Sequence, residues 1–331
     1  MAEGKFPFNR FRVGMMKKSG IEWTDKTWSP VSGCTKVSAG CANCYAKQEV
    51  DSRLSRNPKS IFFGRNFSEV QTHESQLNVP LQWKKPRRIF VCPRGDPFHE
   101  SVPDEFIDRI LAVIKLCPQH TFQILTKRAE RMVAYFSNRI VPLNVWIGVS
   151  IENRTHGLLR INLLQTIEAT VRFLLIEPLI EDIGNIVLTG IHWVICGGET
   201  GVLARPMHPD WVRGLRDQCV AAGVPFLFKQ WGEWILAESG DGYAKVGIKR
   251  SGRLLDGKLY NEYPRLRYEK HELYPFQLRR ESLQQMIEYP EYGIVECRRE
   301  CFPANYTIDR GLRIDEHGKH YAHKHISMTE R

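Results

Sequence analysis

Three cysteines near the start of the chain are the residues best suited to chemistry. Cys34, Cys41 and Cys44 fall within eleven positions, with the spacing C-x6-C-x2-C. Gly33 and Gly40 stand beside them and favour a loop, because glycine adopts backbone conformations that other residues avoid. Such a loop can wrap three sulfurs around one soft metal centre.

The number of cysteines bears on the kind of metal centre. A structural zinc site is normally closed by four ligands, whereas three cysteines on a four-iron cluster leave one iron open to a small molecule. We therefore predict that the three cysteines hold a [4Fe–4S] cluster. Two alternatives stay open: structural thiols that hold no metal, or a zinc site with a distant fourth ligand from His73, Cys92 or His99.

Composition narrows the class of protein. The 331 residues are 42% hydrophobic and 25% charged, which is typical of a globular chain, and no apolar run approaches the roughly 18 residues of a membrane helix. Four of the nine cysteines, Cys92, Cys117, Cys196 and Cys219, stand singly in apolar runs, which favours a reduced, cytoplasmic protein over a disulfide scaffold. The formal net charge of +10 favours an anionic partner such as DNA or a nucleotide, although a merely basic soluble protein is the alternative.

Short apolar runs alternate with amphipathic stretches along most of the chain. The runs are apolar throughout, which is typical of parallel strands covered on both faces. We predict strands at 88–92, 121–126, 144–149, 171–176, 192–196 and 224–228, and a further one within 23–31. We predict helices at 104–116, 128–138, 155–166 and 209–222.

These repeated strand-helix units predict an α/β fold. We expect a (β/α) partial barrel of the TIM type with parallel strands, and an open doubly wound sheet is the alternative. Residues 1–20 are polar and basic and would form a flexible leader, not a secretory signal. Residues 21–234 would form the barrel, and residues 235–331 an irregular C-terminal appendage of unknown role.

Polar and charged residues follow almost every predicted strand. In such folds the chemistry collects in loops beyond the carboxyl ends of the strands, so these residues would meet at one rim. They are Asp96, His99, Lys127, Arg128, Ser150, Glu152, Glu177, Gly197, Gly198, Glu199, Lys229, Gln230 and Trp231.

A cysteine triad after the first strand of such a barrel resembles the radical S-adenosylmethionine enzymes. Their usual spacing is C-x3-C-x2-C, so this chain departs in the first gap. The chain is more similar to a phage-associated, radical-SAM-like family of unknown function that occurs with a three-Cys-motif partner protein. The resemblance covers about 21–234 and rests on the segments 21–25, 28–34, 40–46, 122–128, 146–150, 177–179, 197–199 and 228–232.

The resemblance implies a mechanism. The open iron would bind S-adenosylmethionine, an electron donor such as flavodoxin or ferredoxin would reduce the cluster, and the resulting 5′-deoxyadenosyl radical would take a hydrogen atom from the substrate. The phage association and the basic charge suggest a base or modified nucleotide in DNA as that substrate. The rival hypotheses are a non-catalytic, metal-stabilised module that binds nucleic acid or protein, and a hydrolase using Glu177 and His99.

Roles for the rim residues follow from this scheme. Catalysis would fall to Glu177 and Lys229. Cofactor binding would involve Asp96, Lys127, Ser150, Glu152, Gly197, Gly198 and Glu199, although Gly197-Gly198-Glu199 follows a later strand than the Gly-Gly-Glu signature of radical SAM proteins. Substrate binding would involve His99, Arg128, Gln230 and Trp231.

Overall fold

The computed structural model describes residues 20–237, 240, 242–265, 312–314 and 320–322. Nearly all of the predicted leader and most of the predicted appendage therefore lie outside the described residues. The contacts divide the chain into two units, Met1–Gly293 and Ile294–Arg331. In the second unit, strands β12 (Leu312–Ile314) and β13 (His320–Ala322) form an antiparallel pair.

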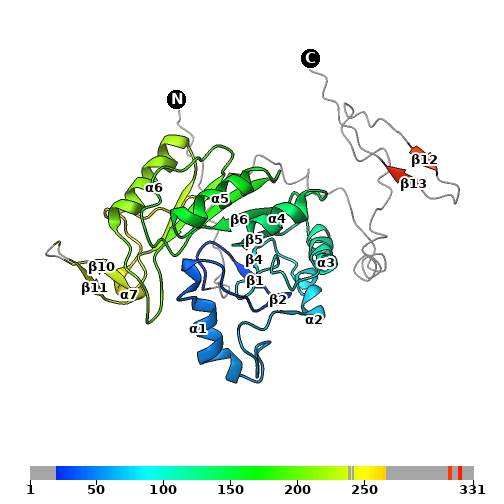
Figure 1. Cartoon of the computed structure of the whole chain (residues 1–331), viewed down its shortest axis with the longest axis horizontal. Coiled ribbons are helices and arrows are strands. Elements are labelled where there is room, and N and C mark those ends of the chain that lie inside the picture. Colours follow the sequence, from blue (N-terminus) through cyan, green and yellow to red (C-terminus); the bar gives the residue numbers. More distant parts are fainter. Residues whose placement is uncertain (1–19, 238–239, 241, 266–311, 315–319, 323–331) are drawn as a thin grey trace, which may run out of the picture. The chain divides into compact units, whose positions relative to one another are not determined.

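A seven-stranded parallel sheet forms the centre of the first unit (Figure 1). Its order is β1-β4-β5-β6-β7-β8-β9, so the strands lie side by side in chain order. Their bounds are Lys26–Trp28, Arg88–Val91, Thr121–Thr126, Val145–Ser150, Val171–Ile176, Trp193–Gly197 and Phe226–Gln230. The predicted strands and the α/β class are confirmed, and the sequential order of parallel strands is consistent with a partial barrel.

Four helices pack against one face of the sheet and enclose the larger core. They are α3 (Asp104–Lys115), α4 (Ala129–Phe136), α5 (Arg154–Gln165) and α6 (Pro209–Ala222). Residues at the helix ends explain where α5 begins and where α6 stops. The Asn153 side chain accepts the His156 amide N–H at the start of α5, and α6 ends at Gly223, which has a φ of 64°.

Large aromatic side chains fill the opposite face of the sheet. Trp146, Phe173 and Trp193 stand on neighbouring strands and pack with Trp23, which lies before β1. Residue 148, on the same strand as Trp146, leaves room for Phe173 because it is glycine: a Cβ there would lie 2.6 Å from the Phe173 ring. This face, which we call the inner face of the sheet, is therefore a packed core below the carboxyl ends of the strands.

Shorter elements complete the first unit. The cysteine-bearing region contains β2 (Val31–Ser32), η1 (Ala39–Cys41), α1 (Tyr45–Ser52), η2 (Leu54–Arg56) and β3 (Gln71–Thr72), followed by α2 (Glu74–Leu77) and η3 (Pro80–Gln82). After β9 come β10 (Trp234–Leu236), β11 (Tyr243–Lys245) and α7 (Ile248–Ser251).

The segment after Trp234 continues the sheet domain as far as residue 265. The Phe228 amide donates to the Tyr260 carbonyl at 3.0 Å, the Trp193 indole N–H donates to the Glu262 carbonyl at 2.8 Å, and Leu255 is fully buried. This segment covers the outer edge of β9, which would otherwise expose unpaired backbone groups. This segment, which the predicted division assigns to the appendage, thus packs on the last strand of the sheet.

Within the described part of the chain, no helix has both the length and the apolar character needed to cross a bilayer.

Candidate active site at the carboxyl ends of the strands

A cavity of about 600 Å³ opens at the carboxyl ends of the strands. Residues at or just beyond the ends of β4, β5, β6, β7, β8 and β9 line it, together with the cysteine loop. The structure thus brings most of the predicted site residues together around one space: Cys34, Cys41, Cys44, Asp96, Lys127, Arg128, Ser150, Glu177, Gly198, Glu199, Lys229 and Gln230.

Four predicted site residues do not line this cavity: His99, Glu152, Gly197 and Trp231. Trp231 packs against Phe228, with ring centroids 4.8 Å apart, and its indole donates to the Leu254 carbonyl. His99 is buried and bonded on both ring nitrogens, to the Thr35 hydroxyl at 2.9 Å and the Ser101 amide at 3.1 Å. These contacts occupy the polar atoms that were expected to reach a substrate.

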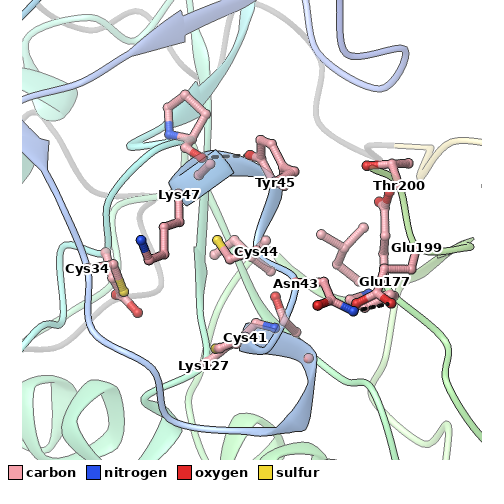
Figure 2. Close-up of a pocket in the computed structure, with 18 of the residues that line it drawn as sticks. Cys34, Cys41, Asn43, Cys44, Tyr45, Lys47, Lys127, Glu177, Glu199 and Thr200 are labelled. Atoms are coloured by element: carbon pink, nitrogen blue, oxygen red, sulfur yellow. Dashed lines mark hydrogen bonds between the residues drawn. The ribbon is translucent and has the colours of Figure 1, made fainter. Parts of the chain in front are cut away.

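The cysteine loop runs from β2 to α1 along one side of the cavity (Figure 2). All three thiols are free and partly exposed. Cys34 follows β2, Cys41 ends η1, and Cys44 stands immediately before α1. Each sulfur is therefore held by a different local element, and all of them line the same space.

Glu152 anchors the middle of the loop from below. Its side chain has no exposed surface and accepts hydrogen bonds from the Ser38 hydroxyl at 2.8 Å, from Arg160 at 2.9 Å and from Lys127. Gly40 lies directly on this carboxylate, because a Cβ at that position would be 2.2 Å from Glu152 Cγ. Both carboxylate oxygens have protein partners, so the contacts assign Glu152 to positioning the loop.

A second buried carboxylate, Glu199, anchors the loop near Cys44. The Asn43 amide donates to it at 3.2 Å, as Figure 2 shows, and Arg205 forms a two-pronged ion pair with it at 2.5 and 2.8 Å. The same guanidinium donates to the Ala39 carbonyl at 3.1 Å. Carboxylates that follow β6 and β8 thus fix the loop at two points.

Arg128 connects Cys34, the first cysteine of the loop, to the sheet. Its guanidinium is buried and donates to Cys34 Sγ at 3.4 Å, to Asp96 at 3.3 Å and to the Thr35 hydroxyl at 2.8 Å. Asp96 in turn accepts from the Thr126 hydroxyl at 2.8 Å. A buried arginine in direct contact with a thiol stabilises negative charge on that sulfur.

The environments of the thiols differ. Burial raises the pKa of Cys34 to about 12, against the opposing charge of Arg128. Burial also disfavours ionisation of Cys41, but the Lys127 charge and hydrogen bonds from the Val37 and Ser38 amides outweigh it, so the Cys41 pKa is lowered.

Glu177 and Lys229 form an ion pair in the cavity wall. The ammonium lies 2.7 Å from Glu177 Oε1, and the Gln230 amide donates to the same oxygen at 3.3 Å and to the Gly198 carbonyl at 2.9 Å. Both charged side chains are mostly but not wholly buried. A carboxylate and an amine in contact beside a cavity can pass a proton to or from a bound molecule.

The side chains around the cavity can be compared with the ligands that a zinc ion and a four-iron cluster need. Among the described residues, no group of three or more His, Cys, Asp or Glu side chains is placed to hold a metal ion. A single ion needs its ligands to converge on one point, whereas a four-iron cluster takes each thiolate on a separate iron. Of the residues offered as a fourth zinc ligand, His73 contacts the Ser32 hydroxyl at 2.7 Å and His99 is bonded on both nitrogens. Cys92 is almost completely buried and lines the same cavity as Cys34, Cys41 and Cys44, so the cluster and the zinc site both stay predictions.

Comparison with known proteins places the chain in a family. A family model described as "Protein of unknown function (DUF5131)" matches residues 18–264. The chain belongs to this family. No curated protein matches the chain. No solved structure matches it either.

The DUF5131 match coincides with the structural domain. It includes the seven strands of the sheet, the segment that packs on β9 and every predicted site residue. The family description assigns no chemistry, so the radical SAM resemblance stays a prediction.

Several residues that shape the DUF5131 site escaped sequence reasoning. Ser38, Asn43 and Arg205 hold the cysteine loop in place, and Thr35 bonds both Arg128 and His99. Ser38 and Asn43 stand between the cysteines, which is a usable signal. Arg205 lies in a loop with no periodic pattern, and nothing in the sequence pairs it with Glu199.

Proposed function

We propose that this protein is a radical SAM enzyme in which Cys34, Cys41 and Cys44 hold a [4Fe–4S] cluster. One observation carries the proposal: three free thiols on one anchored loop line the same cavity as residues from the ends of six parallel strands. That combination puts soft metal donors where substrates bind in α/β folds. When bound, the cluster and S-adenosylmethionine supply one-electron chemistry that removes a hydrogen atom from an unactivated carbon.

The chain's own residues would divide the work around this centre. Arg128 stabilises charge on Cys34, and the Lys127–Glu152 pair fixes the loop beneath Cys41. Glu177 and Lys229 lie in the cavity wall on β7 and β9, where they would bind polar groups of the ligands or move a proton. Gln230 orients the Glu177 carboxylate.

Apolar residues at the base of the cavity would protect a reactive substrate from water. Trp23, Phe90, Leu125 and Leu175 line it and belong to the aromatic core on the inner face of the sheet. Exclusion of water suppresses competing reactions of reactive species. The cavity thus has polar groups at its rim and apolar groups at its base. A polar cofactor would bind at the rim, and the carbon skeleton of a substrate would bind at the base.

The wider assignment follows from the same proposal. The sheet would be a partial barrel of the TIM type, and the protein would work in the reducing cytoplasm with flavodoxin or ferredoxin as electron donor. The substrate would be a base or nucleotide in DNA, and a three-Cys-motif protein would be a partner. The net charge of +10 supports an anionic substrate.

Reductive cleavage of S-adenosylmethionine tests the proposal. The anaerobically reconstituted full chain, reduced with dithionite, should release 5′-deoxyadenosine and methionine, and Cys41→Ala should abolish the release. Cys117→Ala is the matched control, since Cys117 is a buried core thiol far from the loop in sequence. Release that is absent from the wild type, or equal in Cys41→Ala, would refute the enzyme and leave the metal-stabilised binding module.

A further inference from the structure

A second, smaller cavity lies on the other side of the segment that follows β4. Its volume is about 260 Å³. Ser29 and Ser32 border it from the region of β2, the segment from Leu54 to Phe62 borders it after α1, and Arg94 borders it from the turn after β4.

The polar lining of this cavity is made of hydrogen-bond donors and cations. Two basic side chains, three hydroxyls and one amide line it: Ser29, Ser32, Asn57, Lys59, Ser60 and Arg94. None of the described residues that line it is an Asp or Glu. Such a set is complementary to an anion with several acceptor oxygens, because lysine offers a point charge and arginine a planar fork of donors.

The charge balance inside the cavity is positive. Arg94 Nε donates to Glu49 at 2.5 Å, so this guanidinium already has one acidic partner outside the lining. The Lys59 ammonium has no ion-pair partner within the described residues, and its backbone amide donates to Asn57 Oδ1 at 3.0 Å. That bond fixes the turn that carries both side chains. One cation of the lining therefore has no ion-pair partner in the part of the chain that the structure describes.

Apolar side chains support the polar ones. Phe62 is buried, stacks with Phe67 at 6.4 Å between ring centroids and lies under the Arg65 guanidinium at 5.8 Å. Ser32 is almost completely buried, with its hydroxyl 2.7 Å from His73 Nε2. The wall is thus built from packed residues, which limits the conformational cost of binding a ligand.

The two cavities share one stretch of backbone. Arg94 borders the smaller cavity, while its neighbours Pro93 and Gly95 line the larger one. The Tyr45 hydroxyl at the start of α1 donates to the Pro93 carbonyl at 2.7 Å and ties α1 to this stretch. A ligand that occupies one cavity therefore lies next to the other.

We propose that the smaller cavity binds a phosphate group through Lys59, Arg94 and the hydroxyls of Ser29 and Ser60. It would hold the phosphate of a substrate whose reacting part enters the cysteine-lined cavity. The phosphate site stands on its own contacts, and only its link to the larger cavity rests on the proposed function.

Calorimetric titration of the full chain tests the site, with inorganic phosphate, a nucleoside monophosphate and a short DNA oligonucleotide as three separate probes. At least one probe should bind at a single class of site, and Lys59→Gln should weaken that binding roughly tenfold by removing a charged donor. Lys84→Gln is the matched control, because Lys84 is an exposed lysine that precedes β4 at the opposite end of the strand. Thermal melts should show both variants folded, since each changes an exposed side chain.

The three probes separate the sources of the phosphate. If inorganic phosphate binds most tightly, the ligand is a free anion. If the monophosphate binds most tightly, the ligand is a nucleotide, and if the oligonucleotide does, it is a nucleic-acid backbone. Each outcome supports the site, provided that Lys59→Gln weakens the binding of that probe. The inference is overturned if no probe binds at millimolar concentration, or if Lys59→Gln and Lys84→Gln bind the probe with the same affinity. The titration uses protein without iron, so its failure does not bear on cluster binding.

Discussion

At the scale of single residues, the site depends on buried charges that act on sulfur through short contacts. Arg128 is the clearest case, because its guanidinium contacts Cys34 Sγ, Asp96 and Thr35 while almost fully buried. Sequence reasoning assigned this arginine to the substrate. The structure shows that it contacts the loop and also lines the cavity, so its role toward a substrate stays a prediction.

Arg128→Lys should lower the reduction potential of the reconstituted cluster. Lysine keeps the positive charge but cannot donate to sulfur, carboxylate and hydroxyl together, and hydrogen bonds to the ligand sulfurs raise cluster potentials. An anaerobic redox titration followed by electron paramagnetic resonance measures the change at equal iron content. Arg131→Lys is the control, because Arg131 contacts Asp104 and the Val102 carbonyl and not a cysteine. An unchanged potential would refute the role.

Glu152→Gln should destabilise the folded chain by about 3–5 kcal/mol at neutral pH, because it leaves Lys127 and Arg160 without their buried partner. Burial alone would raise the Glu152 pKa, but the charges of Lys127 and Arg160 hold it below its ordinary value of 4.5. The charge therefore stabilises the fold above pH 4.5, and this contribution is lost as the pH falls through the lowered pKa. Urea unfolding of both proteins from pH 7 to pH 3.5 should show the difference shrinking below pH 4.5. A difference that stays constant would contradict this assignment.

At the scale of elements, the cysteine loop is held by contacts to strands far away in the sequence. Carboxylates after β6 and β8 bind Ser38 and Asn43, and Gly40 fits directly over Glu152. The loop should therefore keep its shape before any metal arrives. A prearranged site loses less conformational entropy when it binds.

Gly40→Ala should reduce iron incorporation at least severalfold. Its Cβ would lie 2.2 Å from Glu152 Cγ, so either the loop or the buried carboxylate must move. Iron analysis after reconstitution measures the loss. The control is Gly214→Ala in α6, where a Cβ meets nothing within 4 Å and alanine should stabilise the helix by about 0.5–1 kcal/mol. Equal iron content in the two variants would show that the loop does not depend on this contact.

Local patterns in the sequence predicted the repeating elements well. β5 and β7 match their predicted ranges, and α6 does too, because apolar runs and helix-end signals act over a few neighbouring residues. The packing of the segment from Trp234 to residue 265 on β9 could not be predicted, because it uses backbone hydrogen bonds from turn-rich polar sequence. Its apolar anchor, Leu255, has only Leu254 beside it in a stretch that is otherwise polar.

At the scale of the whole molecule, the sheet gathers residues from distant parts of the sequence around one cavity. Strand order follows chain order, so the loop after each strand reaches the same rim. This topological rule is why most site residues were predictable. Their partners were not: the pairing of Glu199 with Arg205, or of Glu177 with Lys229, depends on distances that a sequence does not contain.

Metal analysis of the anaerobically reconstituted protein tests the central claim most directly. The account predicts a brown protein with about four irons and four sulfides per chain, and a loss of that cluster when Cys34, Cys41 or Cys44 is replaced by alanine. A colourless protein that holds one zinc ion per chain, or one whose iron content is indifferent to these three cysteines, would contradict it.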